Sequence, residues 1–143
     1  MSIDLGRPGP DFLAFWRTPL YSALTTPRPD GTPHVAPVGA TYDPGARLAR
    51  VTARRTSVKV RNVLAAGAPG LRAALCQVDG GHWATLEGVA RVSEAPEAID
   101  EAVRRFEERY GRKVVPNPDR VVIEIALTRA MGRIPAPTAA RQA

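Results

Sequence analysis

The sequence has one cysteine, two histidines and no apolar run long enough to span a membrane, and each scarcity excludes a class of protein. Cys76 cannot form an internal disulfide, and its apolar neighbours Leu75 and Val78 favour a reduced core residue over a nucleophile. A membrane helix needs about 20 consecutive apolar residues, so we expect no membrane partner. The segment 1–4 is neither basic nor followed by an apolar core, unlike a signal peptide, and we therefore expect the protein in the cytoplasm.

Motifs for catalysis by the chain's own side chains are also missing. With only His34 and His82, a metal site would need carboxylates at spacings that the sequence does not contain, so we expect no metal. There is no Gly-x-Ser-x-Gly segment, no Walker loop and no Rossmann fingerprint. We therefore predict no catalytic residue, and chemistry that comes from a phosphate-bearing cofactor.

Hairpin and helix signals predict a single domain that is mainly β. A chain of 143 residues is long enough for one core. Asp30-Gly31 and the segment 79–81 supply the positive φ angles that tight hairpins require. The expected strands are 20–26, 34–42, 48–53, 71–78, 82–92 and 121–127, and the expected helices are 9–16, 57–67 and 96–110. These elements predict a small closed or split antiparallel β-barrel (α+β) of about six strands over residues 1–133, with two to three covering helices and a flexible tail over 134–143.

The strand expected over 34–42 carries two residues that strands usually avoid. Pro37 interrupts the hydrogen-bond ladder, and Gly39 leaves backbone uncovered. Such a strand is either the edge of a sheet or a place where a ligand lies against the main chain. In the strand over 82–92, Gly88 predicts a bulge or bend.

Positive charge is concentrated in one part of the chain. The net charge is +6, and the segment 44–78 holds seven basic residues and no acid. These residues are Arg47, Arg50, Arg54, Arg55, Lys59, Arg61 and Arg72. Nucleic-acid binding is one interpretation. The sequence shows no recognition helix, no aromatic run beside the charges and no zinc-ligand spacing, so we expect no nucleic-acid partner.

The centre of this basic segment predicts an anion site at the start of a helix. Ser57 is placed to cap a helix that ends at Gly67. Its apolar stripe would be Val60, Val63 and Leu64. Arg54, Arg55 and Lys59 crowd the helix start, where the dipole is already positive and each cation costs about 0.3–1 kcal/mol. Unpaired N–H groups, a hydroxyl and several cations together make a phosphate site, whereas the alternative is a solvated basic surface.

Four groups of short motifs occur in a characteristic order. They are Thr32-Pro33-His34-Val35 with Val38 and Asp43-Pro44, Ser57-x-Lys59 with Asn62, Cys76-Gln77-Val78-Asp79-Gly80 with Trp83 and Leu86-Glu87-Gly88, and Arg120-Val121-Val122-Ile123-Glu124. In this order the chain resembles the flavin and deazaflavin oxidoreductases of the pyridoxamine-phosphate-oxidase-like split β-barrel family. Within that family it is most similar to the branch that uses coenzyme F-420, and there to the biliverdin reductases. The motifs cover nearly the whole domain.

The resemblance implies roles for residues on both sides of the basic segment. Ser57 and Lys59 would contact the cofactor phosphate, and Arg54 and Arg55 would be further contacts for the phosphate or the coenzyme's glutamate tail. Three residues would line the strand against which the ring system rests: His34, Pro37 and Val38.

The resemblance also implies a homodimer with two shared sites. Gln77 and Trp83 would border the pocket, from the same or from the partner subunit. Each has a structural alternative: Trp83 as core or dimer packing, and Gln77 as a partner for backbone groups at the subunit interface. His34 has one too, as a hydrogen-bonded strand residue.

The resemblance implies a reductase that passes hydride from reduced F-420 to a conjugated organic acceptor such as biliverdin. We expect solvent to supply the proton, because the sequence offers only His34 and His82 as an acid near the pocket and each has a structural alternative. FMN is the alternative cofactor, although FMN-using oxidases of the family commonly have Ser-Arg-Lys where this chain has Ser57-Val58-Lys59. A non-catalytic carrier of flavin, deazaflavin or haem-derived ligands is the alternative from another class of protein.

Overall fold

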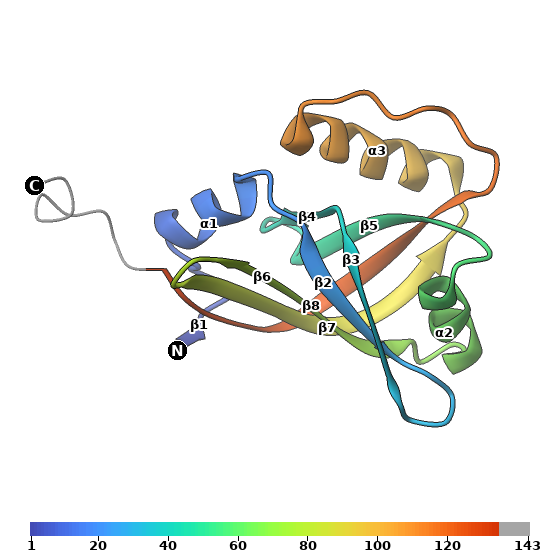
Figure 1. The fold of residues 1–143 in the computed structure, drawn as a ribbon, viewed down its shortest axis with the longest axis horizontal. Helices are drawn as coiled ribbons and strands as arrows, with labels where there is room; N and C mark the ends of the chain where they lie inside the picture. Colours follow the sequence, from blue (N-terminus) through green and yellow to red (C-terminus); the bar gives the residue numbers. More distant parts are fainter. Residues whose placement is uncertain (135–143) are drawn as a thin grey trace, which may run out of the picture.

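The computed structural model describes residues 1–134 of the chain, and these residues form a curled antiparallel sheet with three helices (Figure 1). The strands are β1 Ser2–Ile3, β2 Ser22–Pro27, β3 Pro33–Val38, β4 Ala40–Asp43, β5 Leu48–Arg54, β6 Leu71–Asp79, β7 His82–Ser93 and β8 Arg120–Arg133. The helices are α1 Pro10–Arg17, α2 Val58–Ala66 and α3 Pro96–Tyr110. The predicted mainly β architecture with covering helices is confirmed.

The sheet curls because its two edge strands follow one another in the chain. The strand order is β3-β2-β6-β7-β8-β5-β4, every neighbouring pair is antiparallel, and β1 pairs with β8. β3 ends at Val38 and β4 begins at Ala40, so a single residue joins opposite edges of the sheet. A flat sheet could not place its edges so close together, and the split β-barrel that was predicted follows from this connection.

The single strand predicted over 34–42 is therefore wrong, since Gly39 divides it into β3 and β4. The expectation that Gly39 leaves its backbone uncovered is also wrong. A Cβ atom at Gly39 would collide with the Phe106 ring of α3, so only glycine lets that ring lie against the chain here. Pro37 lies on β3, an edge strand, where a missing N–H group is tolerated.

Gly88 marks a bulge, as predicted. The register between β7 and β8 shifts between Glu87 and Gly88, and a Cβ atom at Gly88 would collide with the carbonyl oxygen of Ala126. β8 extends to Arg133, well past the expected end at residue 127, because β7 and β1 both supply partners for its last residues. Of the tail predicted over 134–143, Ile134 packs against the core, and residues 135–143 lie outside the described residues.

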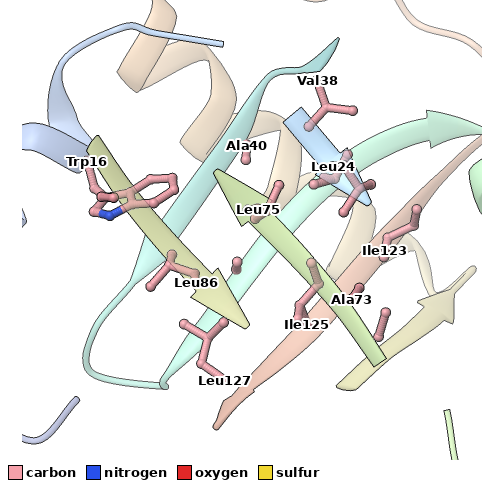
Figure 2. Packing of buried hydrophobic residues seen from close by; sticks show 14 of the residues in the cluster. Trp16, Leu24, Val38, Ala40, Ala73, Leu75, Leu86, Ile123, Ile125 and Leu127 are labelled. Atoms are coloured by element: carbon pink, nitrogen blue, oxygen red, sulfur yellow. The ribbon is translucent and has the colours of Figure 1, made fainter. Parts of the chain in front are cut away.

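Large aliphatic side chains from strands far apart in the sequence meet inside the curled sheet. Figure 2 shows Leu24, Leu75, Leu86, Ile123 and Ile125 in this core, with Trp16 of α1 at one side. Phe12, Phe15 and Trp16 are all at most 5% exposed, which confirms that the first helix closes one end of the core. Cys76 is free but only partly buried, so its expected place in the core is not where the structure puts it.

Fewer apolar residues of α2 are buried than the sequence pattern predicted. Val60 and Val63 are buried as expected, but Leu64 is 54% exposed, and the third buried residue is Asn62. A buried amide needs hydrogen-bond partners, and Asn62 finds them on β2. This polar contact, rather than a wider apolar stripe, fixes how the helix lies on the sheet.

Within residues 1–134, no helix is long and apolar enough to cross a membrane. The same residues contain no group of three or more histidine, cysteine or carboxylate side chains placed to hold a metal ion.

Candidate functional site

The predicted anion site lies where β5 ends and α2 begins. Ser57 occupies the position before α2 with extended backbone, φ −67° and ψ 154°. Its hydroxyl does not cap the helix as predicted, because it donates instead to the carbonyl oxygen of Arg54 at 2.8 Å. In the described part of the chain, the first-turn N–H groups of Val58, Lys59 and Val60 have no acceptor outside the helix, and a first turn offers none inside it. Three donors therefore remain for a ligand.

The cations around this helix start differ in their partners. We call Arg54, Arg55, Ser57 and Lys59 the basic cluster. Arg55 forms an ion pair with Glu94, and its backbone N–H donates to the carbonyl oxygen of Asp119 at 2.8 Å. Arg54 and Lys59 have no carboxylate partner within residues 1–134. Uncompensated positive charge beside unpaired N–H groups is what a phosphate requires.

A buried hydrogen bond connects α2, which follows the basic cluster, to β2. Asn62, one helical turn after Lys59, donates from Nδ2 to Thr26 Oγ1 at 3.1 Å. Thr26 lies opposite His34 in the β2–β3 pairing. His34 is therefore the cross-strand neighbour of the residue that α2 contacts, and its contact with a cofactor stays a prediction. Its Nδ1 atom is shielded and has no hydrogen-bond partner among the described residues.

From His34 onward, β3 forms an open edge of the sheet. Among residues 1–134 it pairs only with β2, so half of its backbone donors and acceptors face away from the sheet. Pro37 is exposed and Val38 is 7% exposed. A flat ring could therefore lie along β3 next to Pro37, whereas Val38 belongs mainly to the core.

Gln77 lies inside the protein and not at an open pocket. It is 1% exposed; its Nε2 donates to the carbonyl oxygen of Phe15 at 3.0 Å, and its Oε1 accepts from Ser22 Oγ at 3.3 Å and from Arg109 Nη2 at 2.9 Å. Ser22 faces Val38 across β2 and β3. The structure thus gives Gln77 a hydrogen-bonding role in the interior, where the carbonyl group of Phe15 is its backbone partner.

Trp83 lies at the other end of the molecule from the basic cluster. It is the second residue of β7, next to the β6–β7 hairpin, whereas α2 lies at the opposite end of the sheet (Figure 1). Arg55 of the basic cluster pairs with Glu94, which directly follows the last residue of β7, Ser93. Trp83 lies ten residues before Ser93, which corresponds to roughly 30 Å along a strand. One chain does not bring Trp83 and Lys59 together, and a contribution from the partner subunit stays a prediction.

Sequence reasoning missed a cavity between α1, β4 and α3. It has a volume of about 300 Å³. Its walls are formed by Leu13, Trp16, Arg17, Thr41, Tyr42, Pro44, Arg105, Glu108 and Arg109. These residues come from three segments far apart in the chain, so no local motif could have indicated them.

Arg109 holds the elements around this cavity together. Its guanidinium donates to the carbonyl oxygens of Thr18 and Ala40, each at 2.7 Å, as well as to Gln77. None of these acceptors is a carboxylate. Burial lowers the pKa of Arg109, with Tyr110 acting in the opposite direction.

Asp43 forms ion pairs with two arginines, Arg105 of the cavity wall and Arg50 of β5. Its carboxylate lies 3.2 Å from Arg50 and 3.1 Å from Arg105. Burial alone would raise the pKa of Asp43, but the N–H of Ala46 and the two guanidinium groups outweigh it and hold the pKa below its ordinary value.

Comparison with known proteins gives consistent matches over most of the chain. The model of the family described as pyridoxamine 5'-phosphate oxidase matches residues 9–132. An F-420H(2)-dependent biliverdin reductase of Mycobacterium tuberculosis (strain CDC 1551 / Oshkosh) is 44% identical over 122 residues, which are 85% of each chain. A solved structure of an F-420 reductase is 25% identical, with a TM-score of 0.66 over 82% of this chain and 94% of that one. The conserved hypothetical protein Rv2991 of M. tuberculosis shares the fold, with a TM-score of 0.70 and 23% identity over 85% of this chain and 81% of that one.

Proposed function

The chain belongs to the pyridoxamine 5'-phosphate oxidase family, and from this premise we propose that it is an oxidoreductase that takes hydride from reduced coenzyme F-420. The acceptor we propose is biliverdin or a related conjugated molecule. The observation that supports the proposal is the helix start in the basic cluster, where N–H groups without an acceptor and cations without a carboxylate partner among residues 1–134 would suit a phosphate. The 44% identical relative, which is named for both F-420 and biliverdin, supports the choice of coenzyme and acceptor.

The residues of the basic cluster would hold the phosphate in different ways. Lys59 supplies an unpaired ammonium group, Arg54 a second cation, and Ser57 a hydroxyl in the same turn. Arg55 would have to give up its ion pair with Glu94 first, so we propose that it contacts the outer phosphate or glutamate tail and contributes less than Lys59.

The ring system of the coenzyme would lie along the open edge of β3, from His34 to Pro37. Val38, at 7% exposed, supports this edge from the core, and Gln77 acts behind it through Ser22. We propose a homodimer in which Trp83 borders the partner's site. Light scattering on the purified protein would detect the dimer, and a monomer that still turns over would contradict the shared site.

When bound, reduced F-420 supplies the hydride that an acceptor carbon receives. The chain's residues would fix the phosphate and leave the open edge of β3 for the ring, so proximity and charge would be the catalytic contributions. The acceptor gains one proton with the hydride, and we propose solvent as its source. Nearby arginine side chains would stabilise the negative charge that develops on the acceptor.

The proposed function is tested with the purified protein and three ligands offered separately: F-420, FMN and haem. We expect F-420 to bind, and reduced F-420 to be oxidised when biliverdin is added with catalytic amounts of protein. Binding of F-420 without turnover would favour a carrier, whereas tight binding of FMN in place of F-420 would contradict the choice of coenzyme.

Replacing His34 by alanine tests the source of the proton. If solvent supplies it, the His34→Ala variant should lose less than about tenfold in turnover, or roughly 1.4 kcal/mol of barrier. Stopped-flow oxidation of reduced F-420 with biliverdin measures this loss. A thousandfold decrease in a variant that still binds coenzyme would make His34 a general acid.

A further inference from the structure

The cavity between α1, β4 and α3 contains polar groups that the protein leaves without partners. Within residues 1–134, five shielded polar atoms have no hydrogen-bond partner, and three of them belong to residues that line this cavity. They are Trp16 Nε1, Thr41 Oγ1 and the hydroxyl of Tyr42. Trp16 and Thr41 are only 3% and 6% exposed, so bulk solvent does not satisfy them either. A buried polar group without a partner is costly, and three around one cavity indicate a missing ligand.

The charge around the cavity indicates what that ligand carries. Arg105 is already paired with Asp43 and Glu101. In the described chain, Arg17 and Arg109 have no carboxylate partner, and Arg109 donates only to neutral oxygens. The indole N–H group of Trp16 can donate but cannot accept. Glu108 also lines the cavity, but Arg104 lies 3.2 Å from its carboxylate and offsets its charge. Two cations without a carboxylate partner and a donor-only group therefore favour an anion with good acceptor oxygens.

The walls of the cavity indicate the rest of the molecule. The rings of Trp16 and Tyr42 lie 6.1 Å apart at an angle of 67°, and Leu13 and Pro44 extend this apolar surface. A volume of about 300 Å³ is at the lower end of the range for small-ligand sites. The space therefore fits a small molecule with a flat apolar body.

We propose that this cavity is a second ligand site, which binds a small carboxylate with a flat apolar body between Arg17 and the rings of Trp16 and Tyr42. The cavity lies away from the basic cluster that would hold the coenzyme phosphate. Tyr42 and Pro44 flank Asp43, which pairs with Leu48 at the start of β5, whereas the basic cluster follows Arg54 at its other end. Six residues of strand correspond to roughly 20 Å. Because the unpaired atoms are shielded, binding includes a small shift of the Trp16 or Tyr42 ring toward the ligand.

The test uses the full chain without coenzyme and benzoate as the probe. Two-dimensional ¹⁵N NMR follows the indole N–H signal of Trp16, which is the one that remains in the Trp83→Phe variant. We expect this signal to move in a saturable way with benzoate at millimolar concentrations. Binding should be at least about fivefold weaker in Arg17→Gln, since one charge-assisted contact is lost, and unchanged in Arg61→Gln, an equal change of charge on α2.

Two further probes separate the chemistry of the ligand. Benzyl alcohol keeps the flat body without the charge, and inorganic phosphate keeps the charge without the body, so both should move the signal less than benzoate. No movement with benzoate would show that the cavity holds only water and would overturn the proposal. Equal movement with either probe, or equal affinity in Arg17→Gln, would overturn the assignment of a flat carboxylate. Neither result depends on F-420, so failure here leaves the proposed function standing.

Discussion

The two ends of β5 carry two kinds of arginine-rich region. At its last residue, the basic cluster is built by consecutive residues of one turn and helix start. At its first residue, the cavity is built by segments around residues 16, 42 and 109, which only the folded sheet and helices bring together. Local sequence therefore places the residues of the first region together, and it does not indicate the second region.

The two regions also differ in what their positive charges do. Lys59 and Arg54 have no carboxylate partner in the part of the chain that the structure describes, and they lie at the positive end of a helix dipole. Arg109 instead joins α3 to the end of α1, to β4 and to β6 through backbone and amide oxygens. Cations in the first region should reduce stability until an anion binds, whereas Arg109 should contribute stability in the free protein.

The largest expected effect is the loss of Arg109. Arg109→Ala leaves the carbonyl oxygens of Thr18 and Ala40 and the amide of Gln77 without their donor, so we expect the free energy of unfolding to fall by about 2–4 kcal/mol. Urea denaturation measures the change. Arg104→Ala is the matched control on the same helix, since its ion pairs with Glu101 and Glu108 are exposed, and it should unfold close to wild type. If Arg109→Ala and Arg104→Ala lost the same free energy of unfolding, Arg109 would not have the stabilising role proposed for it.

A smaller effect is expected at Asp43, which joins Arg50 and Arg105. Asp43→Asn should lower the free energy of unfolding by about 1–3 kcal/mol at pH 7, because two partly buried guanidinium groups lose their carboxylate. The lowered pKa of Asp43 means that its contribution is present above the ordinary value of about 4 and is lost as pH falls through the folded-state pKa. Unfolding curves from pH 7 to pH 2 should therefore converge for variant and wild type at the acid end. A constant difference across that range would contradict the assignment.

The smallest effect is expected at the basic cluster and has the opposite sign. Arg54→Gln removes an exposed cation from the start of α2, so the protein without coenzyme should gain about 0.3–1 kcal/mol of stability at low salt. Added salt should reduce the gain, because exposed charges are screened. Thermal unfolding at two salt concentrations tests both points, and a loss of stability would show that Arg54 has a structural partner in solution.

The same contrast explains which features the sequence predicted. The bulge at Gly88, the helix over 96–110 and the helix start at Ser57 depend on residues close together in the chain, and all three were predicted. The outward position of Leu64 was not predicted, because the contact that orients α2 is made with Thr26, 36 residues away.

Two other features depend on contacts across the fold. Gly39 divides β3 from β4 because the Phe106 ring of α3 lies against it. The sequence around Gly39 contains no pattern that would predict this contact. Gln77 was expected to border a pocket because of the family resemblance. Its side chain instead lies in the interior, where it donates to the carbonyl oxygen of Phe15 and accepts from Arg109. The cytoplasmic location and the absence of nucleic-acid binding stay predictions.

The most direct test of the phosphate assignment is a fluorescence titration of F-420 with wild type, Lys59→Ala and Lys113→Ala. Lys113 is the other lysine of the chain; its side chain is 94% exposed and lies 3.8 Å from Glu107, so its removal controls for the loss of one charge. We expect Lys59→Ala to weaken binding by roughly 1–3 kcal/mol and Lys113→Ala to leave it unchanged, since only Lys59 would contact the phosphate. Equal affinity of wild type and Lys59→Ala would contradict the account.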